Sequence, residues 1–539
     1  MATFNPTPQQ QAAIDCHDSI VITACPGSGK TTVMTAKIRQ VTAKQPSHKG
    51  VIAITFTKKA SEELKKRCKE NAHDTKLSFF GTIDSFCLKE IIQPFLGRIW
   101  GGKPTDCRII KSLDGTQRAL FSHTYNSPTI DELISDQGFK QLYNNGVLWM
   151  SSFAALSNFI INNSSSAQRY IQARYSHVFI DEYQDSSKAQ HELFIKLLEL
   201  GLIATAVGDI DQSIYRFRGG CPELLTDLTT DTVNFRHFEL NVNHRSHPSI
   251  INYASRILDE KHQLIPHDDE SCVFRCTLQG GLKNAAETIT TLITELLENG
   301  SIPHARNIAI LAKKENSLIE FSLGLGFEYR LYKDTPLNDI GTECADIYSD
   351  ILSYKYGSIK TAQDLIERFS FKLKSTPVKD LRKSLKAIHA EQDLEKFIIK
   401  CSRFLELMGY RNFEDENNAV RTIWTDSSLM KMFKIVSNNE VQLMTLHKSK
   451  GLEFKVVFHL DMEEWSFPYR IPGANWDDIQ YPSLVEDTNL HYVGITRAEL
   501  FCLLIRTSLR RNSQGNYSQS NPSYFLRLPQ LEGLYQVYP

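Results

Sequence analysis

The chain has 539 residues, which is too many for one hydrophobic core and predicts two to four domains. Charged residues make up 23% and hydrophobic residues 41%, so the composition is that of an ordinary soluble globular protein. The net charge is −1, so the chain is not basic overall, and nucleic acid binding would need a local basic stripe.

The N-terminal stretch "MATFNPTPQQQAAID" has no basic region followed by an apolar core, so it is unlike a secretory signal. No apolar run approaches the roughly 20 residues of a membrane span. We therefore expect a cytoplasmic protein with no membrane association. Eleven scattered cysteines suit reduced thiols, and Cys272 and Cys276 lack the second ligand pair that zinc needs.

The first predicted element is a buried parallel strand at Ile20–Thr23, followed by a glycine-rich turn and a helix after Lys30. In this order, turn amides and the helix N-terminus converge on an anion, so the turn is a candidate phosphate loop. Lys30 would reach the β- and γ-phosphates, and Thr31 would place its hydroxyl on magnesium. The alternative is a tight turn with a surface lysine, because Ala24 replaces the first glycine of the usual G-x-x-x-x-G-K-[ST] pattern.

A second apolar strand, Val178–Ile180, ends in the acidic pair Asp181 and Glu182. In a nucleotide-binding fold, the first carboxylate of such a pair holds magnesium, and the second orients or deprotonates the attacking water. Two surface acids after a core strand would be the alternative. Two halves of one site in a single chain favour nucleotide hydrolysis.

Eight stretches together resemble the UvrD/Rep-type helicases of superfamily 1A, from about residue 4 to about residue 507. They are "TPQQQAAI", "ITFTKKASEELKKR", "GTIDSF", "DEYQD", "VGDIDQSIYRFRGG", "LNVNHRS", "LMTLHKSKGLEF" and "HYVGITRAE". In this family alanine is common at the position of Ala24, and Asp84 replaces the usual histidine of the third motif. The resemblance implies an α/β fold with two RecA-like, doubly wound, parallel-sheet P-loop NTPase domains and mainly helical insertions.

The resemblance also implies ATP and Mg²⁺ as cofactors, bound between the two RecA-like domains. Gln10 would read adenine, Gln212 would contact the γ-phosphate, and Arg245 and Arg497 would be arginine fingers. His244 would stack on adenine or pack beside Arg245, and Glu453 would face the nucleotide. The full expected nucleotide site contains Gln10, Ala24, Cys25, Pro26, Gly27, Ser28, Gly29, Lys30, Thr31, Thr32, Asp181, Glu182, Gln212, His244, Arg245, Glu453 and Arg497.

For single-stranded DNA, the resemblance makes Phe217 a platform on which a base stacks, which is a sequence-tolerant contact. Tyr215 has either a structural role or a DNA contact. Thr445 and His447 are expected to face DNA or to connect the two sites. Expected phosphate contacts are Thr55, Thr57, Lys58, Thr82 and Ser85.

The order of the motifs predicts two core domains, each interrupted by an insertion. The first core domain comprises residues 1–86 and 172–232, with a helical insertion at 87–171 in which "NNSSSAQ" is a loop. The second comprises residues 233–340 and 437–539, the last part including a C-terminal tail, with a reduced helical insertion at 341–436. A basic cluster in the second insertion is either a solvated helix face or a surface for DNA or a partner. It contains Lys372, Lys374, Lys379, Arg382, Lys383 and Lys386.

These expectations describe an ATP-dependent translocase and helicase that acts on single-stranded DNA and DNA junctions, with 3′–5′ polarity by family resemblance. The alternative keeps the ATPase core and changes its role. The chain would then be a DNA-stimulated sensor or regulatory subunit of an anti-phage defence complex of the Gabija type. Such a subunit would have a nuclease partner and would unwind little DNA by itself. The short insertions and the basic cluster motivate this alternative.

Overall fold

The β-branched runs of the sequence form the strands of two parallel sheets, one in each of two units of the chain. The computed structural model describes residues 5–359, 361–369, 377–473, 479–511 and 514–538. The first unit is Met1–Arg245 and the second is Ser246–Pro539.

The sheet of the first unit has the strand order β3-β2-β6-β7-β1-β8, and every neighbouring pair is parallel. Successive residues of a strand face opposite sides of the sheet, so Ile20 and Ile22 of β1 enter one hydrophobic core and Val21 enters another. The strands are β1 (Ile20–Ala24), β2 (Gly50–Ile54), β3 (Phe79–Gly81), β6 (Tyr175–Ile180), β7 (Ile203–Gly208) and β8 (Arg236–Leu240).

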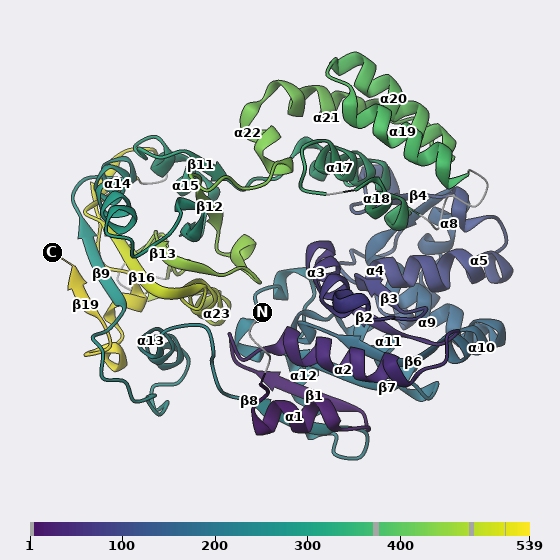
Figure 1. Cartoon of the computed structure of the whole chain (residues 1–539), viewed down its shortest axis with the longest axis horizontal. Helices are drawn as coiled ribbons and strands as arrows, with labels where there is room; N and C mark the ends of the chain where they lie inside the picture. Colours follow the sequence, from purple (N-terminus) through teal and green to yellow (C-terminus); the bar gives the residue numbers. More distant parts are fainter. Residues whose placement is uncertain (1–4, 360, 370–376, 474–478, 512–513, 539) are drawn as a thin grey trace. The chain divides into compact units, whose positions relative to one another are not determined.

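Helices cover both faces of this sheet (Figure 1). One face packs against α1 (Pro8–Asp15), α2 (Lys30–Lys44) and α3 (Lys58–Lys69). The other packs against α11 (Lys188–Glu199) and α12 (Glu223–Thr230). The expected doubly wound parallel arrangement is therefore confirmed for the first sheet.

The first insertion shares its hydrophobic core with the second of these faces, through residues such as Phe86, Ile91 and Phe153. Its helices are α4 (Ile83–Phe86), a π-helix (Cys87–Ile92), α5 (Gln93–Trp100), α6 (Gly115–Arg118), α7 (Ile130–Ser135), α8 (Gly138–Asn144), α9 (Phe153–Asn163) and α10 (Ser165–Arg174). A short parallel pair of strands, β4 (Arg108–Ile110) and β5 (Val147–Trp149), completes it.

The prediction that "NNSSSAQ" is a loop is wrong. Helix α9 ends at Asn163 and α10 begins at Ser165, so only Ser164 lies between them. The hydroxyl of Ser164 accepts a hydrogen bond from the backbone N–H of Ala167 at 3.2 Å. Serine is a strong N-cap, so a run of serines can begin a new helix instead of forming a loop.

The boundary expected between residues 232 and 233 also differs from the structure. Strand β8 lies in the stretch assigned to the second domain, but it pairs in parallel with β1 from Ile20 to Ala24. Hydrogen bonding to β1 places this strand in the first sheet, and the first unit extends to Arg245.

The sheet of the second unit is also entirely parallel, with the order β11-β12-β10-β13-β16-β9-β19. Helices α14 (Leu282–Glu298) and α15 (Glu315–Ser322) share a core with one face, and α13 (Pro248–Leu258) and α23 (Leu484–Ile495) contact the sheet without entering that core. The strands are β9 (Val273–Leu278), β10 (Ile308–Ala312), β11 (Tyr329–Leu331), β12 (Val441–Thr445), β13 (Phe454–His459), β16 (Ala498–Thr507) and β19 (Gln536–Tyr538). Two antiparallel pairs lie outside the sheet: β14 (Ile471–Pro472) with β15 (Ile479–Gln480), and β17 (Leu509–Arg511) with β18 (Tyr517–Gln519). The predicted fold class is confirmed in this unit as well.

The second insertion has a hydrophobic core of its own, built from residues such as Tyr348, Leu385 and Phe397. Its helices are α16 (Pro336–Ile340), α17 (Glu343–Lys355), α18 (Ala362–Phe369), α19 (Val378–Ala390), α20 (Leu394–Leu407), α21 (Glu414–Thr425) and α22 (Ser427–Met430). Of the basic cluster, Lys372 and Lys374 lie outside the described residues. The other four members are exposed on α19: Lys379, Arg382, Lys383 and Lys386.

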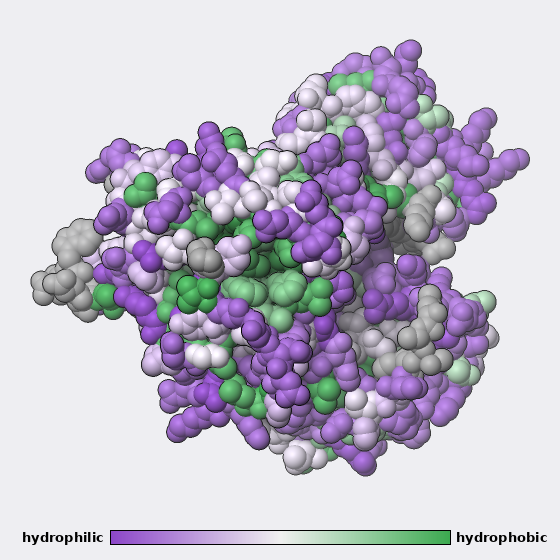
Figure 2. Space-filling view, turned by 60° about the vertical axis from the view of Figure 1, so that its left-hand side comes forward, coloured by the Kyte–Doolittle hydropathy of each residue, from purple (hydrophilic) through white to green (hydrophobic). Residues whose placement is uncertain are grey.

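The visible face in Figure 2 is mostly hydrophilic, with smaller hydrophobic areas between the polar residues. Within the part of the chain that the structure describes, no helix combines the length and the hydrophobicity that crossing a bilayer requires.

The second unit buries two histidines against each other, His459 at the end of β13 and His491 on α23. His459 Nδ1 donates to the Leu460 carbonyl, so its Nε2 accepts from His491 Nδ1 at 3.1 Å. Burial lowers the pKa of His459 to about 4. Burial, and next the neighbouring His459, hold the pKa of His491 well below its ordinary value. Both rings are therefore neutral in the folded protein near pH 7.

These shifts predict an acid-sensitive second unit. In the unfolded chain both histidines become protonated below about pH 6.5. In the folded protein they remain neutral down to about pH 4. Stability is thus complete above pH 6.5 and falls towards pH 4, by about 1.4 kcal/mol per pH unit for each proton. Thermal unfolding at pH 7.5 and 5.0 should show that His491→Asn loses less stability on acidification than the wild type. His48→Asn, at an exposed site in the first unit, is the control. An equal loss in all three proteins would contradict this role for the pair.

Candidate functional site

The glycine-rich turn between β1 and α2 has the geometry of a phosphate-binding loop. Gly27 and Gly29 have φ angles of 71° and 82°, in the region that favours glycine. Helix α2 begins at Lys30, so its N-terminal N–H groups and the turn amides face the same place. Ala24 ends β1, and its side chain belongs to the core below the turn. Its methyl group is accommodated there, which explains why the missing first glycine does not change the turn.

Neighbouring side chains fix the loop from two directions. Gln10 is buried, accepts from the Thr7 N–H at 2.8 Å and donates to the Ser28 carbonyl at 2.8 Å. The Ser28 hydroxyl donates to the Cys25 carbonyl at 2.7 Å. Burial, and next the negative charge of Asp209, raise the pKa of the Cys25 thiol to about 11. The cysteine of the loop is therefore a neutral thiol near pH 7.

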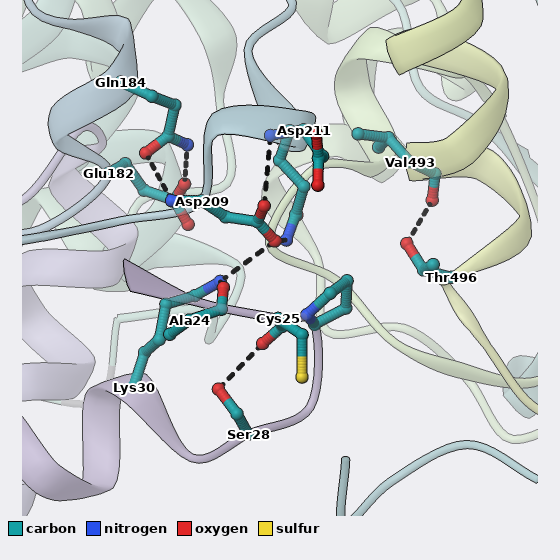
Figure 3. A network of polar contacts seen from close by, with 12 residues as sticks. Ala24, Cys25, Ser28, Lys30, Glu182, Gln184, Asp209, Asp211, Val493 and Thr496 are labelled. Carbon is teal, nitrogen blue, oxygen red and sulfur yellow. Dashed lines mark hydrogen bonds and ion pairs between the residues drawn. The ribbon is translucent and has the colours of Figure 1, made fainter. Parts of the chain in front are cut away.

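Lys30 lies between the end of β1 and the end of β7. Its Nζ donates to the Ala24 carbonyl at 3.0 Å and lies 3.5 Å from Asp209 Oδ2 (Figure 3). The same carboxylate oxygen accepts from Gln212 Nε2 at 2.5 Å. Asp209 thus holds both the loop lysine and the glutamine of the following turn.

The acidic pair lies at the end of β6, where the Asp181 N–H donates to the Ile54 carbonyl of the neighbouring strand. Asp181 Oδ1 accepts from the Glu182 N–H at 3.0 Å. Glu182 itself has a φ of 55°, an uncommon value for a residue with a side chain. Its carboxylate accepts from Gln184 Nε2 at 2.6 Å. Parallel strands therefore bring Lys30, the acidic pair and Gln212 to one edge of the first sheet.

The segment that follows β8 also contacts the phosphate loop. Asn243 Nδ2 donates to the Pro26 carbonyl at 2.5 Å, and the His244 N–H donates to the Gly27 carbonyl at 3.0 Å. A Cβ on Gly27 would lie 2.9 Å from Arg245 Cβ, so the glycine permits this close approach. The structure therefore places Arg245 beside the loop, and the His244 side chain is exposed.

The residues expected around magnesium are Thr31, in the first turn of α2, and Asp181. A hydroxyl and a carboxylate are hard oxygen ligands of the kind that Mg²⁺ prefers, with the remaining positions taken by phosphate and water. Among the described residues, no group of three or more His, Cys, Asp or Glu residues could enclose a metal by itself. The donor set fits a metal that arrives with a nucleotide.

Aromatic side chains form an exposed row beside this edge. Phe56 stacks on Tyr215 with ring centroids 4.8 Å apart, and Tyr215 lies 6.1 Å from Phe217. Phe217 is 55% exposed and Phe56 is 39% exposed, although such rings are usually buried. The guanidinium of Arg218 lies over the Tyr215 and Phe217 rings. The row combines flat apolar faces with positive charge.

The expected phosphate-contacting hydroxyls lie together at the ends of β2 and β3, because the Thr55 N–H donates to the Gly81 carbonyl. Thr57 caps α3, which begins at Lys58, and Thr82 caps α4. The Ser85 hydroxyl donates to the Thr82 carbonyl. Each of these side chains therefore also has a local structural role. Asp84 lies in the same turn, and burial raises its pKa to about 6.

Four predicted residues lie in the second unit. Thr445 ends β12, and His447 begins the 3₁₀ turn after it. Glu453 is exposed. Arg497 is only 2% exposed, and its guanidinium donates to the Val493 and Leu452 carbonyls and to the Thr496 hydroxyl.

Four residues of the first unit were missed by the sequence analysis: Phe56, Gln184, Asp209 and Asn243. All four lie within the stretches quoted in the sequence analysis, so their place in a motif was a usable signal. Phe56 and Asp209 also come shortly after the strands β2 and β7. The contacts of Gln184 with Asp209 and of Asn243 with Pro26 join segments 25 and 217 residues apart, and the sequence gives no local signal for such contacts.

Comparison with known protein families identifies both halves of the chain. The model of the UvrD/REP helicase N-terminal domain matches residues 6–129 and 105–232. The model of the UvrD-like helicase C-terminal domain matches residues 350–507.

Individual relatives align over nearly the whole chain. The Gabija protein GajB of Bacillus cereus is 28% identical over 490 residues, covering 89% of this chain and 91% of the relative. The ATP-dependent DNA helicase Rep of Buchnera aphidicola is 26% identical, covering 95% and 94%. The ATP-dependent DNA helicase PcrA of Staphylococcus epidermidis is 23% identical, covering 96% and 85%. The two parallel sheets, the phosphate loop and both family matches agree, and the chain belongs to the UvrD/Rep-type family of ATP-dependent DNA helicases.

Proposed function

We propose that the chain hydrolyses ATP with Mg²⁺ to move along single-stranded DNA in the 3′–5′ direction and to open duplex junctions. The observation that carries this proposal is the convergence of Lys30, Asp181, Glu182, Gln212 and Arg245 on one edge of the first sheet. The polarity rests on family resemblance alone.

The nucleotide chemistry follows from these positions. The phosphates bind at the N-terminus of α2. Lys30 then leaves its contacts with the Ala24 carbonyl and Asp209 and binds phosphate oxygens instead. Thr31 and Asp181 would hold Mg²⁺, which would neutralise charge on the phosphates. Glu182 takes the proton of the attacking water, and Gln212 contacts the γ-phosphate.

Arginine side chains stabilise the charge that develops on the transferred phosphoryl group. Arg245, beside the phosphate loop, supplies one guanidinium, and Arg497 of the second unit is proposed as the other on the strength of its motif. Arginine suits both roles because its planar fork binds phosphate oxygens in pairs. Gln10, His244 and Glu453 complete the proposed contacts with the nucleotide.

The exposed aromatic row is the proposed platform for single-stranded DNA. Bases stack on aromatic faces without regard to sequence, and Arg218 adds positive charge for the backbone. Thr57 and Thr82, at the N-termini of α3 and α4, and Lys58 would position backbone phosphates. Thr445 and His447 are the proposed contacts from the second unit.

The similarity to the Gabija protein GajB favours a second candidate function. In this reading the chain is a DNA-stimulated ATPase subunit of a defence complex, with a nuclease as partner and little unwinding of its own. The basic surface of α19, formed by Lys379, Arg382, Lys383 and Lys386, is available for such a partner or for DNA.

The first prediction of the proposed function concerns ATP hydrolysis. Single-stranded DNA should raise the ATPase rate of the purified chain many-fold. Lys30→Ala should abolish it, because the loop loses its charge for the phosphates. Glu182→Gln should retain nucleotide binding and lower the rate by about 10²- to 10⁴-fold, because an amide takes no proton. Lys44→Ala, at an exposed lysine of the same helix, should match the wild type. Full activity of Glu182→Gln would remove this residue from the mechanism.

The second prediction concerns DNA binding. Phe217→Ala and Phe56→Ala should each weaken the binding of a labelled single-stranded oligonucleotide by about 1–3 kcal/mol, the stacking energy of one base. Fluorescence anisotropy at fixed salt measures this loss. Val233→Ala, at a 91% exposed apolar side chain of the same unit, is the matched control. Unchanged affinity in both phenylalanine variants would make the row a packing feature.

The third prediction separates the two functions. On a duplex with a 3′ single-stranded tail, the motor should release the complementary strand with ATP, and a duplex with a 5′ tail should remain paired. DNA-stimulated hydrolysis with no strand release on either substrate would instead favour the subunit function. Co-purification with a nuclease from the native source would then identify the partner.

A further inference from the structure

Gln184 follows the acidic pair by two residues and is completely buried, with 0% of its side chain exposed. It lies in the short 3₁₀ turn Tyr183–Asp185 between β6 and α11. Its Nε2 donates to Glu182 Oε2 at 2.6 Å, and its Oε1 accepts from the Asp209 N–H at 3.0 Å. Figure 3 shows this side chain with one contact to Glu182 and one to Asp209.

The chemistry of the two partners fixes the orientation of the carboxamide. A carboxylate only accepts, so the atom beside Glu182 must be the NH₂ group. A backbone N–H only donates, so the atom beside Asp209 must be the carbonyl oxygen. Gln184 therefore connects the proposed general base to the first residue after β7.

The backbone around Gln184 has features that this connection requires. Glu182 adopts the left-handed conformation at φ 55°, which costs energy for a residue with a side chain. A Cβ on Gly208 would lie 2.6 Å from Gln184 Oε1, so the glycine at the end of β7 provides the space for the carboxamide. Uncommon backbone conformations persist where the surroundings hold them, and functional sites are where they gather.

We propose that Gln184 is a positioning residue that holds the carboxylate of Glu182 in the orientation needed to take a proton from water. This inference rests on the proposed role of Glu182 as the general base. Gln184 does not contact the nucleotide in this scheme, and it acts only through Glu182. Its second bond, to the Asp209 N–H, anchors the carboxamide so that it cannot turn away.

Neither methionine nor glutamate would reproduce both contacts of Gln184. Methionine has a similar length and no polar group, so it would fill the space and lose both hydrogen bonds. Glutamate would still accept from the Asp209 N–H, but it would place a second carboxylate against Glu182. Like charges repel at this distance, so Glu182 would move away from the position in which Gln184 holds it.

The experiment measures ATP hydrolysis with saturating single-stranded DNA for the wild type, Gln184→Met and Gln184→Glu. We expect kcat to fall roughly 10- to 100-fold in each variant, the range typical of partners that orient a functional group. Nucleotide affinity, measured with a fluorescent ATP analogue, should change by less than about threefold, since the phosphate loop is intact. The KM for ATP should also stay close to the wild-type value, so that the loss appears in kcat alone.

A matched control is Gln168→Met, which removes a single amide hydrogen bond, to the Ile161 carbonyl at 2.8 Å, elsewhere in the first unit. It should leave kcat and KM unchanged. A purely structural role for Gln184 would lower the melting temperature and the fraction of nucleotide-binding protein, and it would leave kcat per nucleotide-binding site at the wild-type value.

The outcomes separate this inference from the proposed function. A wild-type chain without ATPase activity, or a fully active Glu182→Gln variant, would contradict the proposed function itself. An active wild type with an inactive Glu182→Gln variant would support it. If Gln184→Met and Gln184→Glu then kept the wild-type kcat, the positioning role of Gln184 would be overturned.

Discussion

The carboxyl ends of parallel strands all meet at one edge of a sheet, and the candidate site of the first unit depends on this constraint. The chain leaves β1 into the phosphate loop, β6 into the acidic pair, β7 into Asp209 and β8 into the segment containing Arg245. No one of these turns is a site by itself. In open α/β sheets, ligands bind outside this edge because only there do loops from several strands converge. The close packing of the turns is then possible because Gly27 and Gly208 have no side chain in the way.

Polar contacts among the turns make the edge a single hydrogen-bonded unit. Asp209 bonds with the Gln212 side chain and lies close to Lys30, and Gln184 joins the Asp209 backbone to Glu182. A phosphate group that attracts Lys30 therefore competes with a buried carboxylate. The same turn continues into Tyr215 and Phe217, so Gln212, which is proposed to contact the nucleotide, and the aromatic residues belong to one short segment of chain.

The fold and much of this edge could be predicted from the sequence, since they depend on local patterns. The β-branched run at Ile20–Thr23 and the glycines after it are sufficient to predict a strand, a turn and a helix. The misplaced boundary has a physical reason: β8 has mostly exposed or half-buried residues, so no apolar run marks it as part of the first sheet. The serines near Ser164 suggested a loop because serine favours both turns and helix caps. Gln184 and Asn243 lie inside quoted stretches of the sequence, but their contacts with Asp209 and Pro26 could not have been predicted, because these partners lie 25 and 217 residues away.

The connection between the two units has a mechanical consequence. The first unit ends at Arg245 and the second begins at Ser246, while Asn243 and His244 are hydrogen-bonded to the phosphate loop. Only Arg245 lies between His244, which is bonded to the loop, and Ser246, where the second unit begins. Tension applied along the backbone at Ser246 would reach Pro26 and Gly27 through two hydrogen bonds. A force on the backbone at this link would therefore act directly on the loop where phosphate is expected to bind.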